Sequence, residues 1–294
     1  MKSLFITGST GFVGKNIIKY FNSTFEIYSF SKNEEININQ DVVLHFAGKA
    51  HDLKNTSNVQ EYYSINTELT KQIFDNFLKS DAKVLIFLSS VKAVVDKLDF
   101  ELDEEYMPNP ITHYGKSKLL AEQYIFRNQI PEGKRVFILR PCMIHGPGNK
   151  GNLNLLYKIV SMGLPWPLGE FHNKRSFCSI DNLCFIINEL IENDHIPSGI
   201  YNISDDKPVS TNELIRLISE SQGKKPIIWK IPKILIKSLT LFGDLLHLPF
   251  NSERLSKLSE TYVVSNIKLK KAINKPLPVN SEDGLVKTFI SFNH

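Results

Sequence analysis

Short apolar runs alternate with longer amphipathic segments through the first half of the chain. Five of these runs predict buried strands, at residues 3–7, 25–30, 41–47, 83–88 and 136–139. Three intervening segments have apolar residues at three- and four-residue steps and predict helices, at residues 12–20, 59–78 and 114–127. Continuous apolar strands that alternate with helices indicate an α/β fold, a parallel sheet covered by helices on both faces.

This rhythm changes after about Pro141, where loops rich in glycine and proline appear. We therefore expect residues 1–150 to form one domain and residues 151–294 to form mainly a smaller lobe, with a strand near residues 199–204 returning to the first domain. The most apolar later stretch, residues 231–250, contains Lys233, Lys237 and Asp244 and predicts an amphipathic helix, not a membrane span.

Composition narrows the class of protein without identifying it. The chain has 294 residues and a formal charge of +4, with lysine and arginine spread along it, so we expect no nucleic-acid partner and no membrane partner. Its three cysteines (Cys142, Cys178 and Cys184) lack a CxxC spacing, which favours reduced thiols in a cytoplasmic protein over disulfides or zinc. The first apolar run stops at Thr7, too early for a signal peptide.

A glycine-rich turn separates the first predicted strand from the first predicted helix. Its spacing is G-x-x-G-x-x-G, in which Gly8 permits the tight turn, Gly11 allows close approach of a pyrophosphate, and Gly14 lets the helix pack against the strand. A connector without a ligand is the alternative. The expected dinucleotide contacts in this turn are Gly8, Thr10, Gly11, Phe12, Val13 and Gly14.

A tyrosine and a lysine at positions i and i+4 of a predicted helix, Tyr114 and Lys118, share one face. A neighbouring ammonium stabilises a phenolate and lowers the tyrosine pKa, which suits a general acid/base. Ser89 and Ser90 end a predicted strand, and Ser90 lies 24 residues before Tyr114, where a hydroxyl can bind the same substrate oxygen.

Together, the glycine turn, the serine and the Tyr-x-x-x-Lys pair resemble the extended short-chain dehydrogenases/reductases, a family of sugar-nucleotide epimerases, dehydratases and ketoreductases. The resemblance covers nearly the whole chain, and residues 87–92 and 163–169 with Arg175 are most similar to a bacterial polysaccharide-locus subgroup. It implies a Rossmann-type doubly wound sheet with a C-terminal substrate-binding lobe, an NAD cofactor, and a homodimer formed through residues 59–78 and 114–127.

The resemblance also implies roles for single residues. Tyr114 is the general acid/base at the sugar C4 oxygen, Lys118 binds the nicotinamide ribose and tunes Tyr114, and Ser90 orients the reacting oxygen, with Ser89 as the alternative. Further cofactor contacts are expected at Phe46, Ala47, Gly48, Asn66, Leu88 and Pro141, and substrate contacts at Ser90, Asn152, Leu153 and Arg175.

The chain departs from the family at several positions. Residues 31–40 are too short for the usual helix and strand, and the acidic residue that binds the NAD ribose is replaced by candidates such as Ser31 and Lys32, which leaves NADP as an alternative. Val91 and Lys92 stand where dehydratases carry an acidic pair, which disfavours dehydration.

The sequence therefore favours a UDP-sugar 4-epimerase, such as a UDP-glucose or UDP-N-acetylglucosamine 4-epimerase. The alternative is a 4-ketoreductase that makes UDP-N-acetylquinovosamine or UDP-N-acetylfucosamine, and a non-catalytic dinucleotide sensor is the third hypothesis. We expect His45 to be a structural histidine at a strand end, and His145 to be structural more readily than functional.

Overall fold

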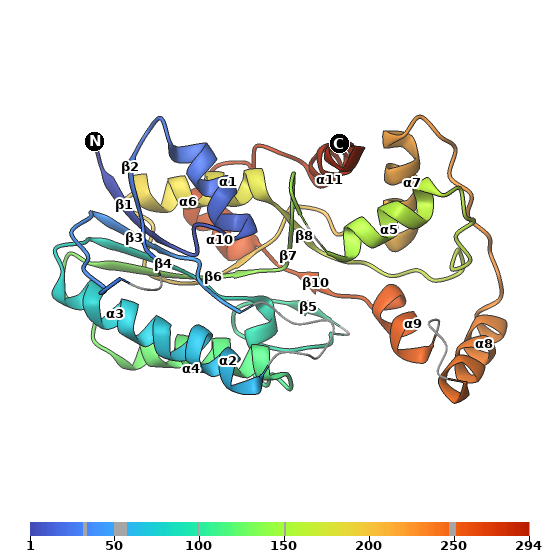
Figure 1. Ribbon diagram of the computed structural model, residues 1–294, viewed down its shortest axis with the longest axis horizontal. Coiled ribbons are helices and arrows are strands. Elements are labelled where there is room, and N and C mark those ends of the chain that lie inside the picture. The colour runs from blue at the N-terminus through green and yellow to red at the C-terminus, as the bar shows by residue number, and fades with distance from the viewer. Residues whose placement is uncertain (32–33, 50–57, 99, 150, 247–250, 294) are drawn as a thin grey trace.

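The computed structural model describes residues 1–294 except 32–33, 50–57, 99, 150, 247–250 and 294. Its centre is a parallel sheet in the order β2-β1-β3-β4-β6-β9 (Figure 1). The strands are β1 (Ser3–Thr7), β2 (Glu26–Ser29), β3 (Val42–His45), β4 (Val84–Leu88), β6 (Arg135–Pro141) and β9 (Gly199–Ile203). This sheet confirms the α/β Rossmann-type fold, and its order reverses direction between β1 and β3, where ligands of such folds bind.

Helices cover both faces of the sheet (Figure 1). One face carries α1 (Phe12–Phe21), α6 (Ile180–Glu192) and α10 (Ile267–Ile273), and the other carries α2 (Val59–Tyr63), α3 (Leu69–Lys79) and α4 (His113–Arg127). Each face has its own apolar core, because β1, β3, β4 and β6 are buried on both sides, whereas the edge strand β2 is largely exposed. Burial on both faces explains why these strands read as continuous apolar runs.

The helix predicted over residues 59–78 is interrupted. A π-helical turn, η1 (Ser64–Glu68), joins α2 to α3. It carries the buried Asn66 and Thr67. Such single π turns occur frequently at functional sites, because the extra residue redirects the side chains that follow it.

The connection from β2 to β3 contains no helix in residues 34–41, the part that the structure describes. Ile36 and Ile38 pack there against the same apolar core as Phe5 and Phe30. In this fold a helix usually covers the sheet between the second and third strands, and here two isoleucines cover it instead. A cavity lies beside them, near the end of β1.

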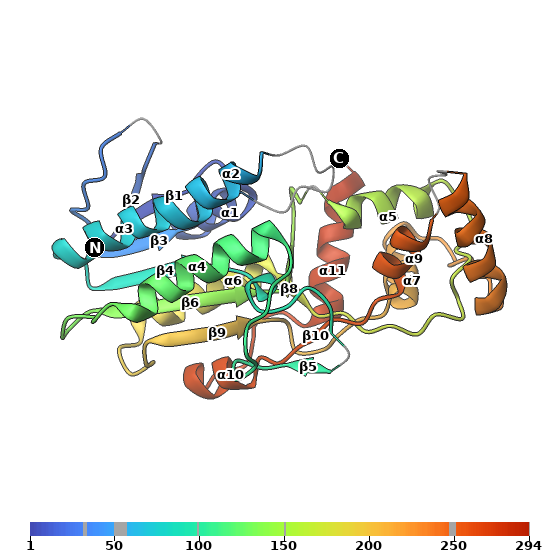
Figure 2. The same cartoon turned by 90° about the horizontal axis from the view of Figure 1, so that it is seen from below.

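The C-terminal lobe projects beyond the ends of the strands (Figure 2). Its helices are α5 (Asn152–Ser161), α7 (Thr211–Ser221), α8 (Lys233–Leu245), α9 (Ser252–Ser259) and α11 (Ser281–Ile290), and its short strand pairs are β7 (Met143–His145) with β8 (Phe177–Ser179) and β5 (Glu101–Leu102) with β10 (Val263–Val264). The lobe has a separate core in which Trp166 is 5% exposed. β9 and α6 follow residue 151 in the sequence but belong to the sheet domain. We therefore propose that the second domain begins near residue 151 and that these two elements interrupt it.

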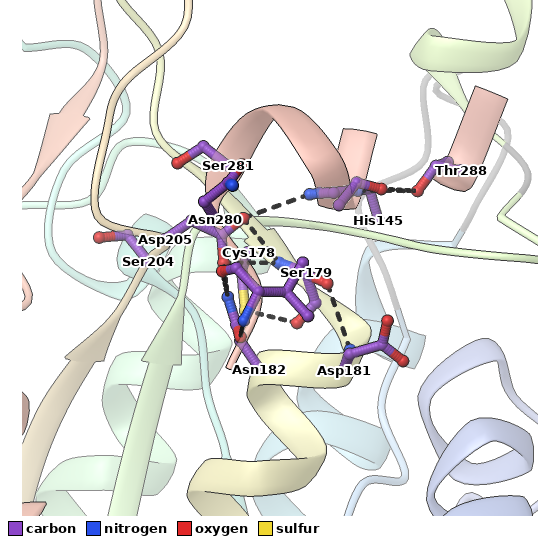
Figure 3. Close-up of polar contacts among 12 residues, drawn as sticks. His145, Cys178, Ser179, Asp181, Asn182, Ser204, Asp205, Asn280, Ser281 and Thr288 are labelled. Atoms are coloured by element: carbon purple, nitrogen blue, oxygen red, sulfur yellow. Dashed lines mark hydrogen bonds and ion pairs between the residues drawn. The ribbon is translucent and has the colours of Figure 1, made fainter. Parts of the chain in front are cut away.

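A buried polar cluster joins the lobe to the sheet (Figure 3). The Asp205 carboxylate accepts hydrogen bonds from the Ser179 backbone N–H at 3.0 Å and from Asn182 Nδ2 at 2.7 Å. His145 is fully buried, with Nδ1 2.9 Å from Thr288 Oγ1 and Nε2 3.4 Å from Asp205 Oδ2. His145 therefore ties α11 to β9, as a structural residue does.

Candidate active site

A cavity of about 890 Å³ lies at the carboxyl ends of β1 and β3. It coincides with the point where the strand order reverses. Its position and elongated lining suit a dinucleotide. The lining includes Thr7, Gly8, Ser9, Thr10, Ser29, Phe30, Ser31, Glu34, Glu35, Ile36, Ala47, Ser64 and Ile65.

Two glycines shape the floor of this cavity. Gly8 has φ of +73°, and a Cβ there would lie 2.6 Å from the Ala47 backbone nitrogen. At Gly14 a Cβ would lie 2.3 Å from the Gly8 carbonyl oxygen. Both contacts are with backbone, so neither position accepts a side chain without a shift of the turn.

The first turn of α1 faces the cavity from the glycine-rich loop. Its N-cap is Gly11, and no side chain of the described residues caps it or adds an acidic group to its first turn. Uncapped N–H groups and the helix dipole favour an anion such as a pyrophosphate. The residues present therefore fit a dinucleotide cofactor.

Tyr114 lies in the first turn of α4, which is fixed firmly. Thr112 caps the helix by accepting a hydrogen bond from the Gly115 N–H at 3.2 Å, and the Asp96 carboxylate accepts from the Ile111 N–H at 2.7 Å. The side chain of Ser90 lies close enough to the Tyr114 phenol to act on its pKa as a hydrogen-bond partner. The structure thus brings together the serine and the tyrosine that the sequence singled out.

The pKa of Tyr114 differs in direction from the sequence expectation. Burial raises the pKa above its ordinary value, and the hydrogen bond with Ser90 opposes this only in part. Lys118 does not lower it here, because its Nζ donates instead to the Leu88 carbonyl oxygen at 2.8 Å. In the protein alone, Tyr114 is a protonated phenol at neutral pH.

Lys118 is itself buried, with 4% of its surface exposed. Burial lowers its pKa to about 8, and its Nζ lies 4.8 Å from the centre of the Phe87 ring. A Cβ on Gly48 would lie 3.1 Å from the same nitrogen. The ammonium therefore sits between the end of β4 and the loop after β3, beside the cavity wall.

Asn66 braces this loop from the π-helical turn. Its Oδ1 accepts from the Lys49 N–H at 2.8 Å, and its Nδ2 donates to Ser117 Oγ at 2.9 Å. A π turn is suited to this role because Asn66 must reach both the loop and α4. Asn66 acts as a positioning residue for the loop that lines the cofactor cavity.

His45 is also explained by the structure. Its Nδ1 lies 2.6 Å from Thr7 Oγ1 and its Nε2 lies 2.9 Å from Thr70 Oγ1, so both ring nitrogens are satisfied. Burial lowers its pKa to about 3, and the ring stays neutral at physiological pH. Its two partners are the hydroxyl groups of Thr7 and Thr70.

Ser89 and Ser90, adjacent in sequence, have different environments. Ser89 Oγ donates to the carboxylate of Glu122, which also holds Arg140 Nε at 3.1 Å. All three side chains are buried. Ser89 therefore belongs to a buried ion pair, whereas Ser90 is the serine paired with the phenol.

A second cavity, of about 230 Å³, extends from Ser90 towards the lobe. Arg175 lines it and pairs with Glu260 at 3.4 Å, and Lys92 lines it with Nζ 4.1 Å from the centre of the Tyr262 ring. Burial lowers the pKa of both cations, while Glu260 raises each of them. Two cations close to the reacting pair favour an anionic substrate.

Other predicted residues are placed elsewhere. Leu153 is 3% exposed and packs in the core of the lobe, and Asn152 begins α5, so neither lines the second cavity. Ser31 lines the first cavity, whereas Lys32 lies outside the described residues. Phe12, Val13 and Phe46 pack against the sheet core beside the glycine turn.

The sequence reading missed three residues of the site. Glu34 lines the first cavity, and its Oε2 accepts from the Ser31 N–H at 3.1 Å. Lys92 was noticed only as a departure from dehydratases. The Oε1 atom of Glu260 is buried without a hydrogen-bond partner among the described residues. Glu260 is distant in sequence from every motif named above, so no local pattern marks it as a residue of the site.

Comparisons with known proteins agree with this geometry. The chain is 29% identical to a UDP-glucose 4-epimerase of Vibrio cholerae, over 99% of this chain and 95% of that one. It is 26% identical to an N-acetyl-alpha-D-glucosaminyl-diphospho-ditrans,octacis-undecaprenol 4-epimerase of Escherichia coli O157:H7, over 92% and 85%. A solved UDP-glucuronic acid 4-epimerase of Bacillus cereus in complex with NAD superposes with a TM-score of 0.76, at 17% identity over 99% and 98%.

A match to a protein family covers most of the chain. Residues 22–233 match the 3-beta hydroxysteroid dehydrogenase/isomerase family, a span that runs from the end of α1 to the start of α8. The sheet order, the glycine turn and the paired Ser90 and Tyr114 agree with that match. The chain belongs to the 3-beta hydroxysteroid dehydrogenase/isomerase family and is an enzyme of the extended short-chain dehydrogenase/reductase class.

Proposed function

We propose that this enzyme inverts the configuration at C4 of a UDP-sugar, with UDP-glucose or UDP-N-acetylglucosamine as substrate and NAD as cofactor. The observation that carries the proposal is the pairing of the Tyr114 phenol with the side chain of Ser90, which lines the second cavity. One cavity fits a dinucleotide, and the other presents Arg175 and Lys92 to an anion. A sugar diphosphate is the group that the names of both curated relatives share.

In this mechanism the protein residues bind, orient and move one proton. Arg175 offers a fork of donors to the diphosphate, and Ser90 orients the C4 oxygen towards Tyr114. Tyr114, once its phenol has lost its proton, takes the proton of the C4 hydroxyl as that carbon is oxidised and returns it after the ketone has presented its other face. A bound nicotinamide supplies the hydride acceptor and donor.

The lining of the first cavity supports NAD over NADP. The Glu34 carboxylate accepts from the Tyr28 hydroxyl at 3.0 Å and from the Ser31 N–H, directly after β2. An acidic group there suits ribose hydroxyls and repels a 2′-phosphate. We expect Glu34 to take the place of the acidic residue that the sequence lacks at the end of β2.

The test is to incubate the purified protein with UDP-glucose and UDP-N-acetylglucosamine without added cofactor and to follow C4 epimers by NMR. Turnover without external reductant is expected, because an epimerase regenerates its cofactor. Denaturing the purified protein should release NAD, which mass spectrometry identifies. Strict dependence on NAD(P)H and a 4-keto sugar would show the ketoreductase instead. Binding of the dinucleotide without turnover of any tested sugar nucleotide would favour the sensor.

The neighbouring serines provide a matched pair of variants. Ser90→Ala should lower kcat/KM by about 10²-fold, because it removes a hydrogen bond to the reacting oxygen and to Tyr114. Ser89→Ala should instead lower the free energy of unfolding by about 1–3 kcal/mol, since Glu122 loses a buried donor. Steady-state kinetics and urea unfolding separate the two, and an equal loss of kcat/KM in both variants would contradict the assignment.

The homodimer and the cytoplasmic location stay predictions. α3 and α4 lie side by side on one face of the sheet (Figure 1). Leu120 and Phe126 of α4 are 44% and 54% exposed, which supports a contact between two copies on this face.

A further inference from the structure

α8 (Lys233–Leu245) lies at the end of the lobe farthest from β2 (Figures 1 and 2). It packs on the lobe through a narrow strip, of which Ile236 is 3% and Thr240 is 1% exposed. On its remaining surface most large apolar side chains are left open to solvent. Their exposed fractions are Ile234 78%, Leu235 61%, Leu239 58%, Leu241 64%, Phe242 63%, Leu245 74% and Leu246 63%.

These side chains form one continuous face. At about 100° per residue, the seven exposed positions cover roughly 160° of the helix circumference. The buried strip of Ile236, Thr240 and Gly243 lies opposite, and Lys233 and Lys237 lie between the two. An apolar sector of this width is unusual on a solvent-facing helix and marks an interaction surface.

The charge around this face is positive. Residues 224–246 contain five lysines and one acidic residue, Asp244. The Oδ1 atom of Asp244 accepts the Ser252 N–H at 3.0 Å and so caps the start of α9. Trp229 precedes α8 and is 55% exposed, while its backbone N–H is held by the Trp166 carbonyl oxygen at 2.8 Å.

We propose that α8 docks on the surface of an anionic phospholipid bilayer, with its apolar face in the acyl boundary and its lysines among the phosphates. An apolar sector flanked by lysines, with a tryptophan beside it, is the chemistry of a helix that lies in the membrane interface. This reverses the sequence expectation of no membrane partner.

The geometry favours this occupant over the alternatives. A helix of 13 residues is about 20 Å long, too short for the roughly 30 Å of a bilayer core, and no helix in the described ranges is long and apolar enough to cross one. A second copy would bring its own lysine row to the same two-fold interface, where like charges repel. An anionic surface pairs with that row instead.

Docking at α8 connects directly to the active site. α9 packs on α8, and the residue that directly follows α9 is Glu260, the ion-pair partner of Arg175, which lines the second cavity. In the docked state the membrane surface would contact the substrate-binding lobe through α8. The sheet domain lies at the opposite end of the molecule (Figure 2) and would remain in solvent.

The experiment is co-sedimentation of the full chain with vesicles of phosphatidylcholine alone or mixed with phosphatidylglycerol. The wild type should bind the mixed vesicles, and added salt should weaken binding. The triple variant L235S/F242S/L245S should bind at least about tenfold less. The matched control is M107S/I111S, which removes apolar groups that are 83% and 74% exposed away from α8 and should bind like the wild type.

Two outcomes would overturn the proposal. One is equal sedimentation of the wild type and the triple variant. The other is that the wild type does not bind vesicles and is a dimer in light scattering, while the triple variant is a monomer. That result would assign the apolar face to a second copy of the chain. Turnover of a water-soluble sugar nucleotide should be unchanged in the triple variant, so a failed docking test and a failed function test are distinguishable.

Discussion

Replacement of Tyr114 by phenylalanine is expected to lower kcat by about 10³-fold. In this mechanism the phenol carries the C4 proton, and phenylalanine keeps the ring whose centre lies 6.4 Å from that of Tyr62. The fold and the dinucleotide cavity should therefore survive. Steady-state kinetics with the sugar nucleotide measure the loss, and calorimetric titration with NAD should show an unchanged affinity.

Tyr63→Phe is the matched control for this prediction. Its hydroxyl lies 3.0 Å from His113 Nδ1, one residue from Tyr114, and this exposed hydrogen bond does not involve Ser90. It should change kcat by less than about twofold, as a surface substitution does. Turnover by Tyr114→Phe at the wild-type rate would remove the phenol from the mechanism and favour the dinucleotide sensor.

The pKa of Tyr114 adds a requirement to this chemistry. The sequence predicted that Lys118 would make the phenol acidic, but the ammonium donates to Leu88 and burial dominates. The i, i+4 spacing predicts that Tyr114 and Lys118 share a helix face. It does not predict which acceptor the flexible lysine side chain binds. A bound oxidised nicotinamide is a further cation, and cations near a phenol lower its pKa.

The sheet was predictable because its strands are buried on both sides. A strand such as β3, with all four residues buried, leaves an apolar run that no helix of this length would produce. The predicted ends of the elements in this half differ from the observed ones by few residues. The π-helical turn at Asn66 was not predictable, because its apolar periodicity is close to that of an α-helix.

The lobe was predicted only in outline, because its elements are short and its contacts are distant in sequence. Arg175, for example, is positioned by backbone bonds to Val209, and its ion pair is with Glu260, 85 residues away. Local patterns carry no information on such pairs. The family resemblance implied a substrate contact for Leu153, whereas the structure has this side chain 3% exposed in the core of the lobe.

α8 illustrates a different limit. The sequence predicted an amphipathic helix there, and the structure contains one. The pattern shows that one face is apolar, but it cannot show whether that face meets the protein. The narrow strip of Ile236 and Thr240 is the buried one, and the wide apolar face is open. Only the packing of the lobe distinguishes the two.

The largest expected effect on stability is at the buried ion pair beneath the site. Arg140 and Glu122 are 2% and 1% exposed, and the guanidinium Nε lies 3.1 Å from both carboxylate oxygens. Arg140→Met should lower the free energy of unfolding by about 3–5 kcal/mol, because it leaves the Glu122 carboxylate buried without its counter-ion. Urea unfolding measures the change.

A compensating variant tests the physical cause. Arg140→Met combined with Glu122→Gln removes both charges and keeps an acceptor for Ser89, so it should recover most of the lost stability. The control is Lys257→Met, which breaks an exposed pair with Glu253 and should cost less than about 1 kcal/mol. If Arg140→Met instead kept full stability and lost only turnover, Arg140 would act on the substrate or cofactor. Ser89, which shares the Glu122 carboxylate with Arg140, would then again be a candidate for the serine that orients the reacting oxygen.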